Sequence, residues 1–250
     1  MNRIVNIMPM GGLGARFLNS KYKLPKPLIK IKQKPMFIQA AKSMPKSDLN
    51  IFVCNKNLVK KYKINKILKK EYKNKFKLIT INKVTKGQAN TCLLAERHLK
   101  KNDQIFIHSC DNLLKYNLKT LYQKIEVNDG VILTTKPNQI HLKNIKSYGW
   151  VNLKKNKVSK ITCKVKASLK PKNDFVIVGS FAFKNKKIFS KTIRNLIKSK
   201  KKINNEYYMD MVFSYALQKN YTIENLEVDS YSSWGTPEEL EKWKKKGGKI

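Results

Sequence analysis

The sequence predicts an α/β protein with a doubly wound, mostly parallel sheet. Short apolar runs alternate with helical patterns through the first half of the 250-residue chain, and this alternation is typical of βαβ units. After Gly130 the pattern changes to closely spaced β segments that are followed by helices. Hydrophobic residues make up 41% of the chain, which is enough to fill the core of one sizeable α/β domain.

Buried strands are expected at five short apolar runs of the first half. These runs are Val5–Met8, Ile51–Val53, Leu78–Ile81, Ile105–Ile107 and Val131–Leu133. The segments between them with helical patterns are Pro35–Met44, Leu58–Tyr72, Gln88–Leu99 and Leu118–Val127. Because helices of this length connect parallel strands, this half is expected to form a doubly wound core of the nucleotide-binding type.

The second half combines β segments with three helices. The β segments are Trp150–Leu153, Val158–Thr162 and Val176–Phe183, and the first two helices are Lys186–Ser199 and Glu206–Gln218. A capping box with Thr236 at N-cap, Pro237 at N1 and Glu239 at N3 predicts a last helix to about Lys245. No proline- or serine-rich linker separates the halves. We therefore expect a single domain over 1–250, with 1–130 as its nucleotide-binding half and 131–250 as its acceptor-binding half.

The formal net charge of +38 raises the possibility of a nucleic-acid partner. Lysine supplies almost all of this charge, and the only arginines are Arg3, Arg16, Arg97 and Arg194. Recognition of bases and phosphates favours arginine, so we expect a solvated lysine surface without a specific nucleic-acid partner. Adventitious binding to RNA or to an anionic membrane stays open as the alternative.

The remaining composition points to a cytoplasmic protein. The longest apolar stretch, Phe175–Phe183, is about half of the roughly 20 residues that span a bilayer, so no transmembrane helix is expected. The N-terminal run is interrupted by Pro9 and three glycines, unlike a signal peptide. Four widely spaced cysteines, without C-x-x-C pairs, indicate neither a zinc site nor a disulfide framework.

The glycine-rich loop after the first predicted strand is the strongest local signal. Gly11, Gly12 and Gly14 allow backbone N–H groups to approach a phosphate, although such clusters also form simple tight turns. The loop has neither the Walker spacing nor the dinucleotide G-x-G-x-x-G spacing. Downstream, Arg16 and a lysine held between two prolines, Lys26, favour a phosphate site over a turn.

At this level of detail the sequence resembles the sugar-phosphate nucleotidylyltransferase family, including its capsule- and surface-polysaccharide members. The matching motifs occur in order over nearly the whole chain, and together they are highly specific. They are Met8–Phe17, Leu24–Ile29, Thr85–Ala89, Ser109–Asn112, Ser147–Trp150, Lys164, Val178–Phe183, Asn205–Tyr208 and Gly235–Leu240.

The resemblance implies a nucleotidyltransferase fold, similar to that of GT-A enzymes, and a Mg²⁺-dependent reaction. An acceptor phosphate oxygen attacks the α-phosphorus of an NTP in line and releases pyrophosphate. The partners would be an NTP of unspecified base and a small phosphate monoester, such as a sugar phosphate used for surface polysaccharides. This chemistry depends on positioning and charge neutralisation more than on a general base.

The family motifs also assign roles to residues of this chain. Catalytic roles fall to Arg16 at the leaving phosphates, Lys26 at the α-phosphate, and Asp111 as the Mg²⁺ ligand. The expected nucleotide-binding residues are Met10, Gly11, Gly12, Gly14, Gly87 and Gln88. The expected acceptor-binding residues are Gly149, Lys164, Gly179 and Glu206. Read without the family, Asp111 could equally be a turn or N-cap residue, and Lys164 could be a solvated lysine.

The chain departs from the family pattern at two positions. Many members carry an acidic metal ligand two residues before the Gly-Thr pair, where this chain has Ser233. The metal would then be held by Asp111, NTP phosphates and water, with Asp229 as an outside candidate. The frequent Glu-Lys pair of the acceptor site is here Cys163-Lys164.

Two other classes of function compete with this interpretation. A glycosyltransferase that uses a nucleotide sugar commonly carries an Asp-x-Asp metal motif, and this chain has no such triplet. A non-enzymatic nucleotide- or RNA-binding protein would explain the charge and the serine at position 233. It would not need Arg16, Lys26 and Asp111 together.

Overall fold

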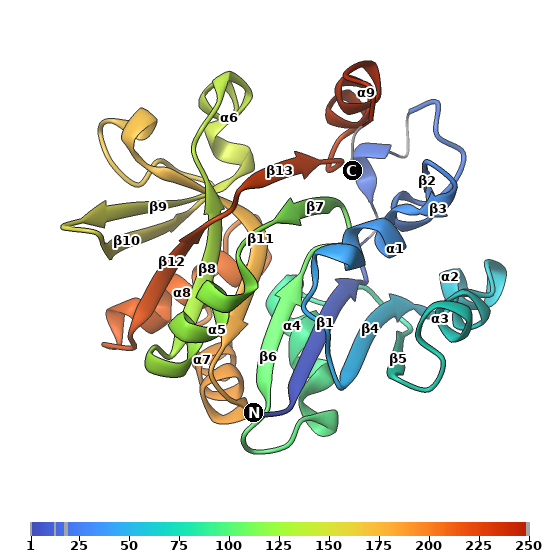
Figure 1. Cartoon of the computed structure of the whole chain (residues 1–250), viewed down its shortest axis with the longest axis horizontal. Helices are drawn as coiled ribbons and strands as arrows, with labels where there is room; N and C mark the ends of the chain where they lie inside the picture. The colour runs from blue at the N-terminus through green and yellow to red at the C-terminus, as the bar shows by residue number, and fades with distance from the viewer. Residues whose placement is uncertain (1, 13, 18–19, 249–250) are drawn as a thin grey trace.

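The computed structural model describes residues 2–12, 14–17 and 20–248 (Figure 1). A sheet of nine strands crosses the described part of the chain in the order β10-β9-β11-β6-β1-β4-β5; in addition β8 pairs with β11, and β12 pairs with β8. Its strands are β1 (Ile4–Met10), β4 (Leu49–Asn55), β5 (Phe76–Ile81), β6 (Gln104–His108), β8 (Gly130–Thr135), β9 (Gly149–Lys154), β10 (Lys157–Cys163), β11 (Phe175–Phe183) and β12 (Ile223–Glu227). All eight predicted strands are therefore confirmed.

The sheet is mixed, and its parallel part is the half that the βαβ pattern predicted. β1 pairs in parallel with β4 and β6, and β4 pairs in parallel with β5. β11 runs antiparallel to β6, β8 and β9, while β8 and β12 are parallel to each other. Most strands thus point the same way, as expected, and β11 joins the two halves of the sheet.

The helices agree with the sequence pattern in position more than in length. They are α1 (Met36–Ala40), α2 (Lys56–Lys61), α3 (Ile64–Tyr72), α4 (Gln88–Leu93), α5 (Leu118–Val127), α6 (Gln139–Lys143), α7 (Lys186–Lys198), α8 (Met209–Gln218) and α9 (Pro237–Lys245). Short 3₁₀ turns occur at Ala15–Phe17, Lys26–Leu28, Ala41–Ser43, Leu94–His98, Ile145–Ser147 and Pro171–Asn173. No helix of the described chain has both the length and the apolar character needed to cross a membrane.

Four of the predicted helices are shorter than expected or broken. The single helix expected over Leu58–Tyr72 is split into α2 and α3 because Lys63 adopts φ +49°. The helices expected over Pro35–Met44 and Gln88–Leu99 end early and continue as 3₁₀ turns. α8 begins at Met209 and not at Glu206, because Tyr207 hydrogen-bonds with its backbone to Lys86 and Ala89.

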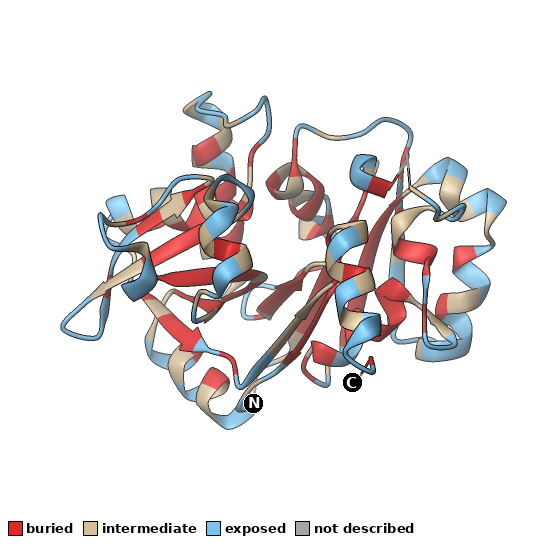
Figure 2. Ribbon diagram, turned by 90° about the horizontal axis from the view of Figure 1, so that it is seen from above, coloured by how far each residue is buried: buried red, intermediate tan, exposed pale blue. Residues whose placement is uncertain are grey.

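Alternating side chains of the strands fill two cores, one on each face of the sheet. On β6, Ile105 and Ile107 pack with α4, α7 and α8, whereas Phe106 points to the opposite face and packs with α5. On β1, Met8 and Met10 pack with α1 and with Trp234 near the C-terminus. Figure 2 shows the buried strands between these outer helices.

Two further strand pairs had no clear sequence signal. β7 (Asn112–Lys115) pairs with β13 (Ser230–Ser233) in an antiparallel ribbon, so segments more than a hundred residues apart lie side by side (Figure 1). β2 (Lys30–Ile31) pairs with β3 (Lys34–Pro35). These strands are short, and β13 is polar throughout, so neither apolar periodicity nor length could identify them.

The pairing partners of β11 change at Gly179. The beginning of β11 pairs with β9 through Phe175 and Val176, and its end pairs with β6 from Ser180 onward. Between these parts the register to β8 shifts, and Gly179 adopts φ +73°. β6 and β9 thus lie beside different parts of one strand, and Ser109, just after β6, donates its N–H to the Gly179 carbonyl between these parts (3.1 Å).

Candidate active site

The glycine-rich loop leads from the end of β1 into a 3₁₀ turn. Position 14 requires glycine, because φ is +64° and an added Cβ would lie 3.0 Å from the Cβ of Lys26. Its carbonyl accepts a hydrogen bond from the Phe17 N–H (2.8 Å), which closes the turn that carries Arg16. At Gly12, by contrast, an added Cβ would meet nothing within 4 Å. Leu13, part of the matching motif, lies outside the described residues.

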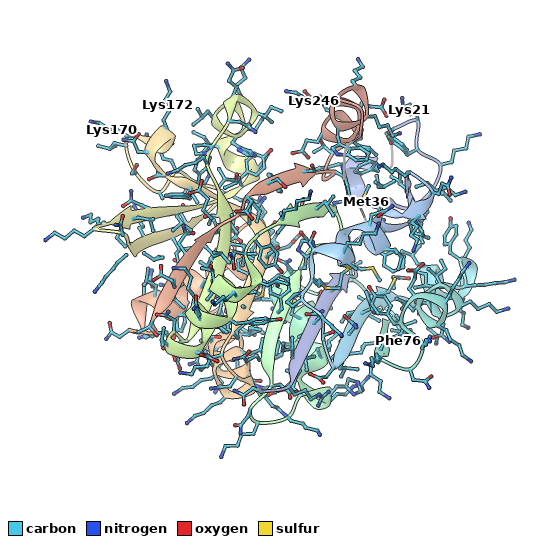
Figure 3. All side chains as sticks on the ribbon, viewed as in Figure 1. Lys21, Met36, Phe76, Lys170, Lys172 and Lys246 are labelled. Atoms are coloured by element: carbon cyan, nitrogen blue, oxygen red, sulfur yellow. The ribbon has the colours of Figure 1, made fainter. Side chains whose placement is uncertain are left out.

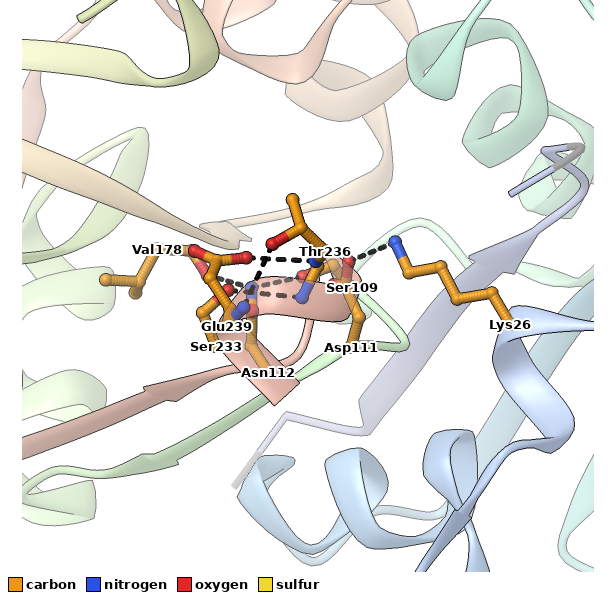
Figure 4. Close-up of polar contacts among 9 residues, drawn as sticks. Lys26, Ser109, Asp111, Asn112, Val178, Ser233, Thr236 and Glu239 are labelled. Carbon is orange, nitrogen blue, oxygen red and sulfur yellow. Dashed lines mark hydrogen bonds and ion pairs between the residues drawn. The ribbon is translucent and has the colours of Figure 1, made fainter. Parts of the chain in front are cut away.

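The ammonium group of Lys26 forms an ion pair and a hydrogen bond with Asp111 Oδ2 (Figure 4). Both side chains are largely buried, with 19% and 16% of their surfaces exposed. Burial alone would raise the pKa of Asp111, but the adjacent Lys26 outweighs it and holds that pKa below its usual value. The pKa of Lys26 is raised for the complementary reason, since Asp111 overcomes the effect of burial. The pair is therefore fully ionised near neutral pH.

The loop after β6 fixes the position of Asp111. Asn112 donates through Nδ2 to Ser109 Oγ (2.7 Å) and to the Val178 carbonyl on β11 (2.8 Å). The carbonyl of Asp111 itself accepts a hydrogen bond from the Trp234 N–H (2.8 Å). Asp111 thus stands at the carboxyl end of a sheet strand, where open α/β sheets bind their ligands.

A pocket of about 420 Å³, here called the glycine-loop pocket, lies on one side of this pair. All six residues expected to bind a nucleotide line it together with Lys26 and Asp111, namely Met10, Gly11, Gly12, Gly14, Gly87 and Gln88. Gly87 adopts φ +111°, and an added Cβ would lie 2.6 Å from the backbone N and O of Tyr207. This close approach joins the Gly87 loop of the first half to the segment before α8.

A second pocket of about 300 Å³, here called the tyrosine pocket, lies on the other side of Asp111. Tyr148 and Tyr231 line it, as do Gly149 and Gly179, which were expected on the acceptor side. Asp111 lines both pockets, so it stands where they meet. Other charged residues of the tyrosine pocket are Arg16, Asp210, Glu238, Glu239 and Lys242.

Three expected site residues have positions that the motif match did not specify. Arg16 lines the tyrosine pocket and not the glycine-loop pocket, and Glu206 lines the glycine-loop pocket and not the tyrosine pocket. Lys164 lines neither of the two, and its Nζ lies 4.8 Å from the centre of the Tyr208 ring. Its backbone N–H donates to the Tyr148 carbonyl (2.9 Å), which keeps it at the margin of the tyrosine pocket.

Asp210 is a pocket residue that the sequence did not identify. It occupies the first turn of α8, and its Oδ2 would lie 2.2 Å from a Cβ added at Gly149. Burial raises the pKa of Asp210 to about 6, although the charge of Lys164 acts in the opposite direction. The available signal for Asp210 was an acidic residue two positions after the Tyr207-Tyr208 pair. Nothing in the sequence, however, indicated that this residue of α8 would lie opposite Gly149 of β9.

Oxygen atoms suited to a metal gather around Gly235. A Cβ added there would lie 3.2 Å from Glu239 Oε2 and 3.4 Å from both Asp111 Oδ2 and Ser233 Oγ. Carboxylate and hydroxyl oxygens are the donors that Mg²⁺ prefers. The described chain has no group of three or more His, Cys, Asp or Glu residues placed to hold a metal alone, so bound phosphates and water would complete the coordination. Asp229 does not contribute, because it lies beyond the end of β13 opposite to Ser233.

Three solved structures with the same fold share only 15–16% of their sequence with this chain. The nucleoside-diphosphate-sugar pyrophosphorylase from Vibrio cholerae RC9 superposes with a TM-score of 0.76 at 16% identity and covers 95% of this chain and 98% of its own. The inositol-1-phosphate CTP transferase from T. maritima gives 0.73 at 15% identity, covering 96% and 91%. HddC from Yersinia pseudotuberculosis, complexed with GMP-PN, gives 0.67 at 16% identity, covering 98% and 99%.

The sequence itself carries the family relationship. A comparison with curated proteins finds no match. The family model described as nucleotidyl transferase matches residues 5–246, and this range includes both pockets and the ion pair between them. The chain belongs to the nucleotidyl transferase family.

Proposed function

We propose that the protein transfers a nucleoside monophosphate from an NTP to a sugar phosphate, or to a similar small phosphate monoester, and serves surface-polysaccharide synthesis. The observation that carries this proposal is the Lys26–Asp111 pair at the junction of two pockets. A transfer between two substrates needs two sites that meet at the reacting atoms. The acceptor class is supported by the sugar pyrophosphorylase and the inositol-1-phosphate CTP transferase among the structural relatives.

In this proposal the NTP occupies the glycine-loop pocket and the acceptor occupies the tyrosine pocket, between Gly149 and Gly179. An oxygen of the acceptor phosphate forms a bond to the α-phosphorus, and the bond from that phosphorus to the bridging oxygen of the β-phosphate breaks. Pyrophosphate leaves with the electron pair. The attacking oxygen is already anionic, so no side chain has to remove a proton.

Charge neutralisation is the part that the protein supplies. Lys26 stabilises the negative charge that builds up at the α-phosphorus. Arg16 is assigned to the departing phosphates; it lines the tyrosine pocket, but its charge acts on Lys26, so it lies near the junction of the two pockets. Lys164, held at the edge of the tyrosine pocket, is assigned to the acceptor, whereas Glu206 lines the glycine-loop pocket and is therefore assigned to the nucleotide. A fixed ammonium group acts most strongly where water is excluded, and Lys26 is largely buried.

The oxygens of Asp111, Ser233 and Glu239 near Gly235 would hold Mg²⁺ together with the phosphates of the NTP. The ion would supply Lewis-acid stabilisation of the transferring phosphate. Asp111 is the anionic ligand in this set that also contacts Lys26, and it thereby orients the ammonium group toward the same phosphate. Ser233 contributes only a neutral hydroxyl, so weaker metal binding is expected than for a site with a carboxylate at this position.

The two halves are proposed to work as one domain in the cytoplasm, where NTPs are available. Residues 1–130 would bind the nucleotide, and residues 131–250 would bind the acceptor. Continuity of the sheet supports this division, because β11 of the second half pairs directly with β6 of the first.

Pyrophosphate release tests the proposal. The purified protein is incubated with Mg²⁺, one of CTP, UTP, GTP, ATP or dTTP, and a panel of sugar phosphates and other phosphate monoesters. Release that requires one NTP and one acceptor, and stops with EDTA, is expected. Absence of release over the whole panel, from protein shown to be folded by circular dichroism, would contradict it and favour a nucleotide-binding protein without catalysis.

A further inference from the structure

The segment 136–174, here called the basic lobe, has an unusual balance of charge even in this chain. It contains eleven lysines, no arginine and a single acid, Asp174. Asp174 is fully buried and accepts hydrogen bonds from Asn152 Nδ2 and from the N–H and hydroxyl of Ser168. The surface of this lobe therefore carries lysine charges with no exposed acid to balance them, whereas the other parts of the chain hold fifteen of the sixteen acids.

Two apolar side chains protrude among these lysines, on the loop between β10 and β11. Leu169 is 87% exposed and Val165 is 55% exposed. Lys164, Lys166, Lys170 and Lys172 belong to the same loop. Figure 3 shows Lys170 and Lys172 extending outward from it into solvent.

The loop displays Leu169 on a defined backbone. Ala167 is buried, and Ser168 is held by Asp174 Oδ2 through two hydrogen bonds of 2.9 Å. The Ser168 hydroxyl in turn accepts the Lys170 N–H (3.1 Å). The buried Ala167 and the hydrogen-bonded Ser168 therefore fix the backbone before Leu169, and the Leu169 side chain is held in solvent.

We propose that the basic lobe docks on an anionic phospholipid surface, with Leu169 and Val165 entering the boundary between headgroups and acyl chains. The lysines approach the lipid phosphates while their aliphatic stems lie along the apolar boundary. Exposed apolar groups surrounded by lysines are the composition that peripheral membrane segments use. Three exposed lysines of the loop, Lys166, Lys170 and Lys172, lie on the same short segment as the two apolar groups. Lys164 is not part of this set, because its Nζ lies against the Tyr208 ring and it is assigned to the acceptor.

The same residues fit a nucleic acid less well. Recognition of bases and bidentate binding of phosphates favour arginine, which the lobe lacks. Binding of single strands uses exposed aromatic rings for stacking. In the lobe Trp150 is fully buried, and Tyr148 lines the tyrosine pocket and donates to Glu239.

Docking would bring the tyrosine pocket close to the lipid surface. The loop begins at Lys164, whose N–H is bonded to the carbonyl of Tyr148 in the pocket wall. This inference does not depend on which NTP or acceptor the enzyme uses, or on whether it is catalytic.

Co-sedimentation with vesicles tests the inference. One set of vesicles contains phosphatidylglycerol and phosphatidylcholine in equal parts, and the other contains phosphatidylcholine alone. The full-length protein is expected to bind the anionic vesicles only. Leu169→Asp should weaken this binding by about tenfold, the effect of keeping one leucine side chain in water.

Val127→Asp is the matched control, since it likewise replaces an exposed apolar side chain, in this case a valine that is 75% exposed, with an acid. Val127 precedes the start of β8, whereas the basic lobe follows the end of that strand, so the two sites are separated by the strand's length. Binding of this variant should stay within about twofold of the unmodified protein. An equal loss in both variants, or no loss in Leu169→Asp, would overturn the proposal.

A second pair of variants separates the lobe from the total charge. Lys170→Glu/Lys172→Glu should reduce vesicle binding by about tenfold or more. Lys60→Glu/Lys61→Glu on α2 changes the net charge equally, but it should have a much smaller effect. A single-stranded RNA homopolymer provides the last control. If the RNA competes with the vesicles, and if Leu169→Asp binds both the RNA and the vesicles as tightly as the unmodified protein does, the lobe is a general polyanion surface. The membrane proposal then fails.

Discussion

The two pockets that meet at Asp111 are built in different ways. The glycine-loop pocket is lined mainly by two short stretches at the ends of parallel strands, around residues 9–15 and 84–91, and four of its residues are glycines. The tyrosine pocket is lined by residues from six separate segments of the chain, and six of them are charged, against three in the glycine-loop pocket. A glycine offers a ligand only its backbone, whereas a charged side chain that contacts a ligand can be exchanged by a single substitution. The second pocket is therefore where specificity for the acceptor is expected to lie.

The largest expected effect is at the junction of the two pockets. Lys26→Ala and Asp111→Ala should each lower kcat of the proposed reaction by about 10²–10³-fold, because charge stabilisation at the reacting phosphate is lost. Each single variant also leaves an unpaired, largely buried charge and should lose stability.

The double variant Lys26→Ala/Asp111→Ala sharpens this prediction. It removes both charges, so part of the lost free energy of unfolding should return while turnover stays low. Urea unfolding and pyrophosphate release on the same samples give both quantities. Near-normal turnover in any of the folded variants would remove that residue from the mechanism.

The need for glycine in the glycine-loop pocket can be tested at two positions. Gly87→Ala should lower the free energy of unfolding by about 3 kcal/mol, because φ is +111° and the new Cβ meets the Tyr207 backbone at 2.6 Å. Gly12→Ala is the matched control, since its Cβ would meet nothing within 4 Å, and a change within about 0.5 kcal/mol is expected. Equal effects in chemical denaturation would show that the contact at Gly87 is not a constraint.

Asp210 of the tyrosine pocket is predicted to make the stability of the protein depend on pH. Its folded-state pKa of about 6 lies above the usual value of 3.8, so the folded protein holds this proton more tightly than the unfolded chain. The stability that Asp210 contributes is therefore complete below about pH 4 and is lost as the pH rises through about 6, by about 3 kcal/mol.

The asparagine of Asp210→Asn cannot titrate, so this variant should lack the loss of stability with rising pH. The difference in unfolding free energy between the two proteins, measured by urea denaturation at about pH 4 and about pH 7, is expected to shift in favour of the asparagine variant at the higher pH. A difference that stays constant with pH would mean that the carboxyl is well solvated.

The smallest effect is expected at Ser233. Ser233→Asp adds a third carboxylate beside those of Asp111 and Glu239, so the Mg²⁺ concentration for half-maximal activity should fall several-fold. Ser233→Asn has a similar size without the charge and serves as the control. The same fall in both variants, or no change in Ser233→Asp, would place the metal away from Gly235.

The contrast between the pockets also explains how much the sequence could predict. The strands of the first half were found because each is an apolar run of the right length, and the glycine loop was found because its residues are contiguous. All the expected nucleotide-side residues line one pocket, although Gly87 and Gln88 were singled out only by the resemblance to a family. Gly149 and Gly179, which have no local signal and were also named by that resemblance, both line the second pocket.

Residues whose positions depend on pairing between distant segments were harder to predict. Asp210 faces Gly149 only because α8 packs beside β9 and β10. The β7–β13 ribbon could not be read from Ser230–Ser233, and α8 was expected three residues too early because the pairing of Tyr207 with Lys86 is not a local property. Local patterns record propensity, whereas these features are decided by tertiary contacts.

The β7–β13 ribbon also has a consequence for the order in which the molecule is assembled. A protein is synthesised from its N-terminus, and the loop that carries Asp111 emerges long before β13 and Trp234, which fix that loop from the other side. The glycine loop and the parallel strands can therefore form early, while the junction of the two pockets waits for the last part of the chain. A nascent protein that has already gained most of its sheet would still be inactive, and its competence would depend on a contact of long sequence separation, the kind that forms slowly.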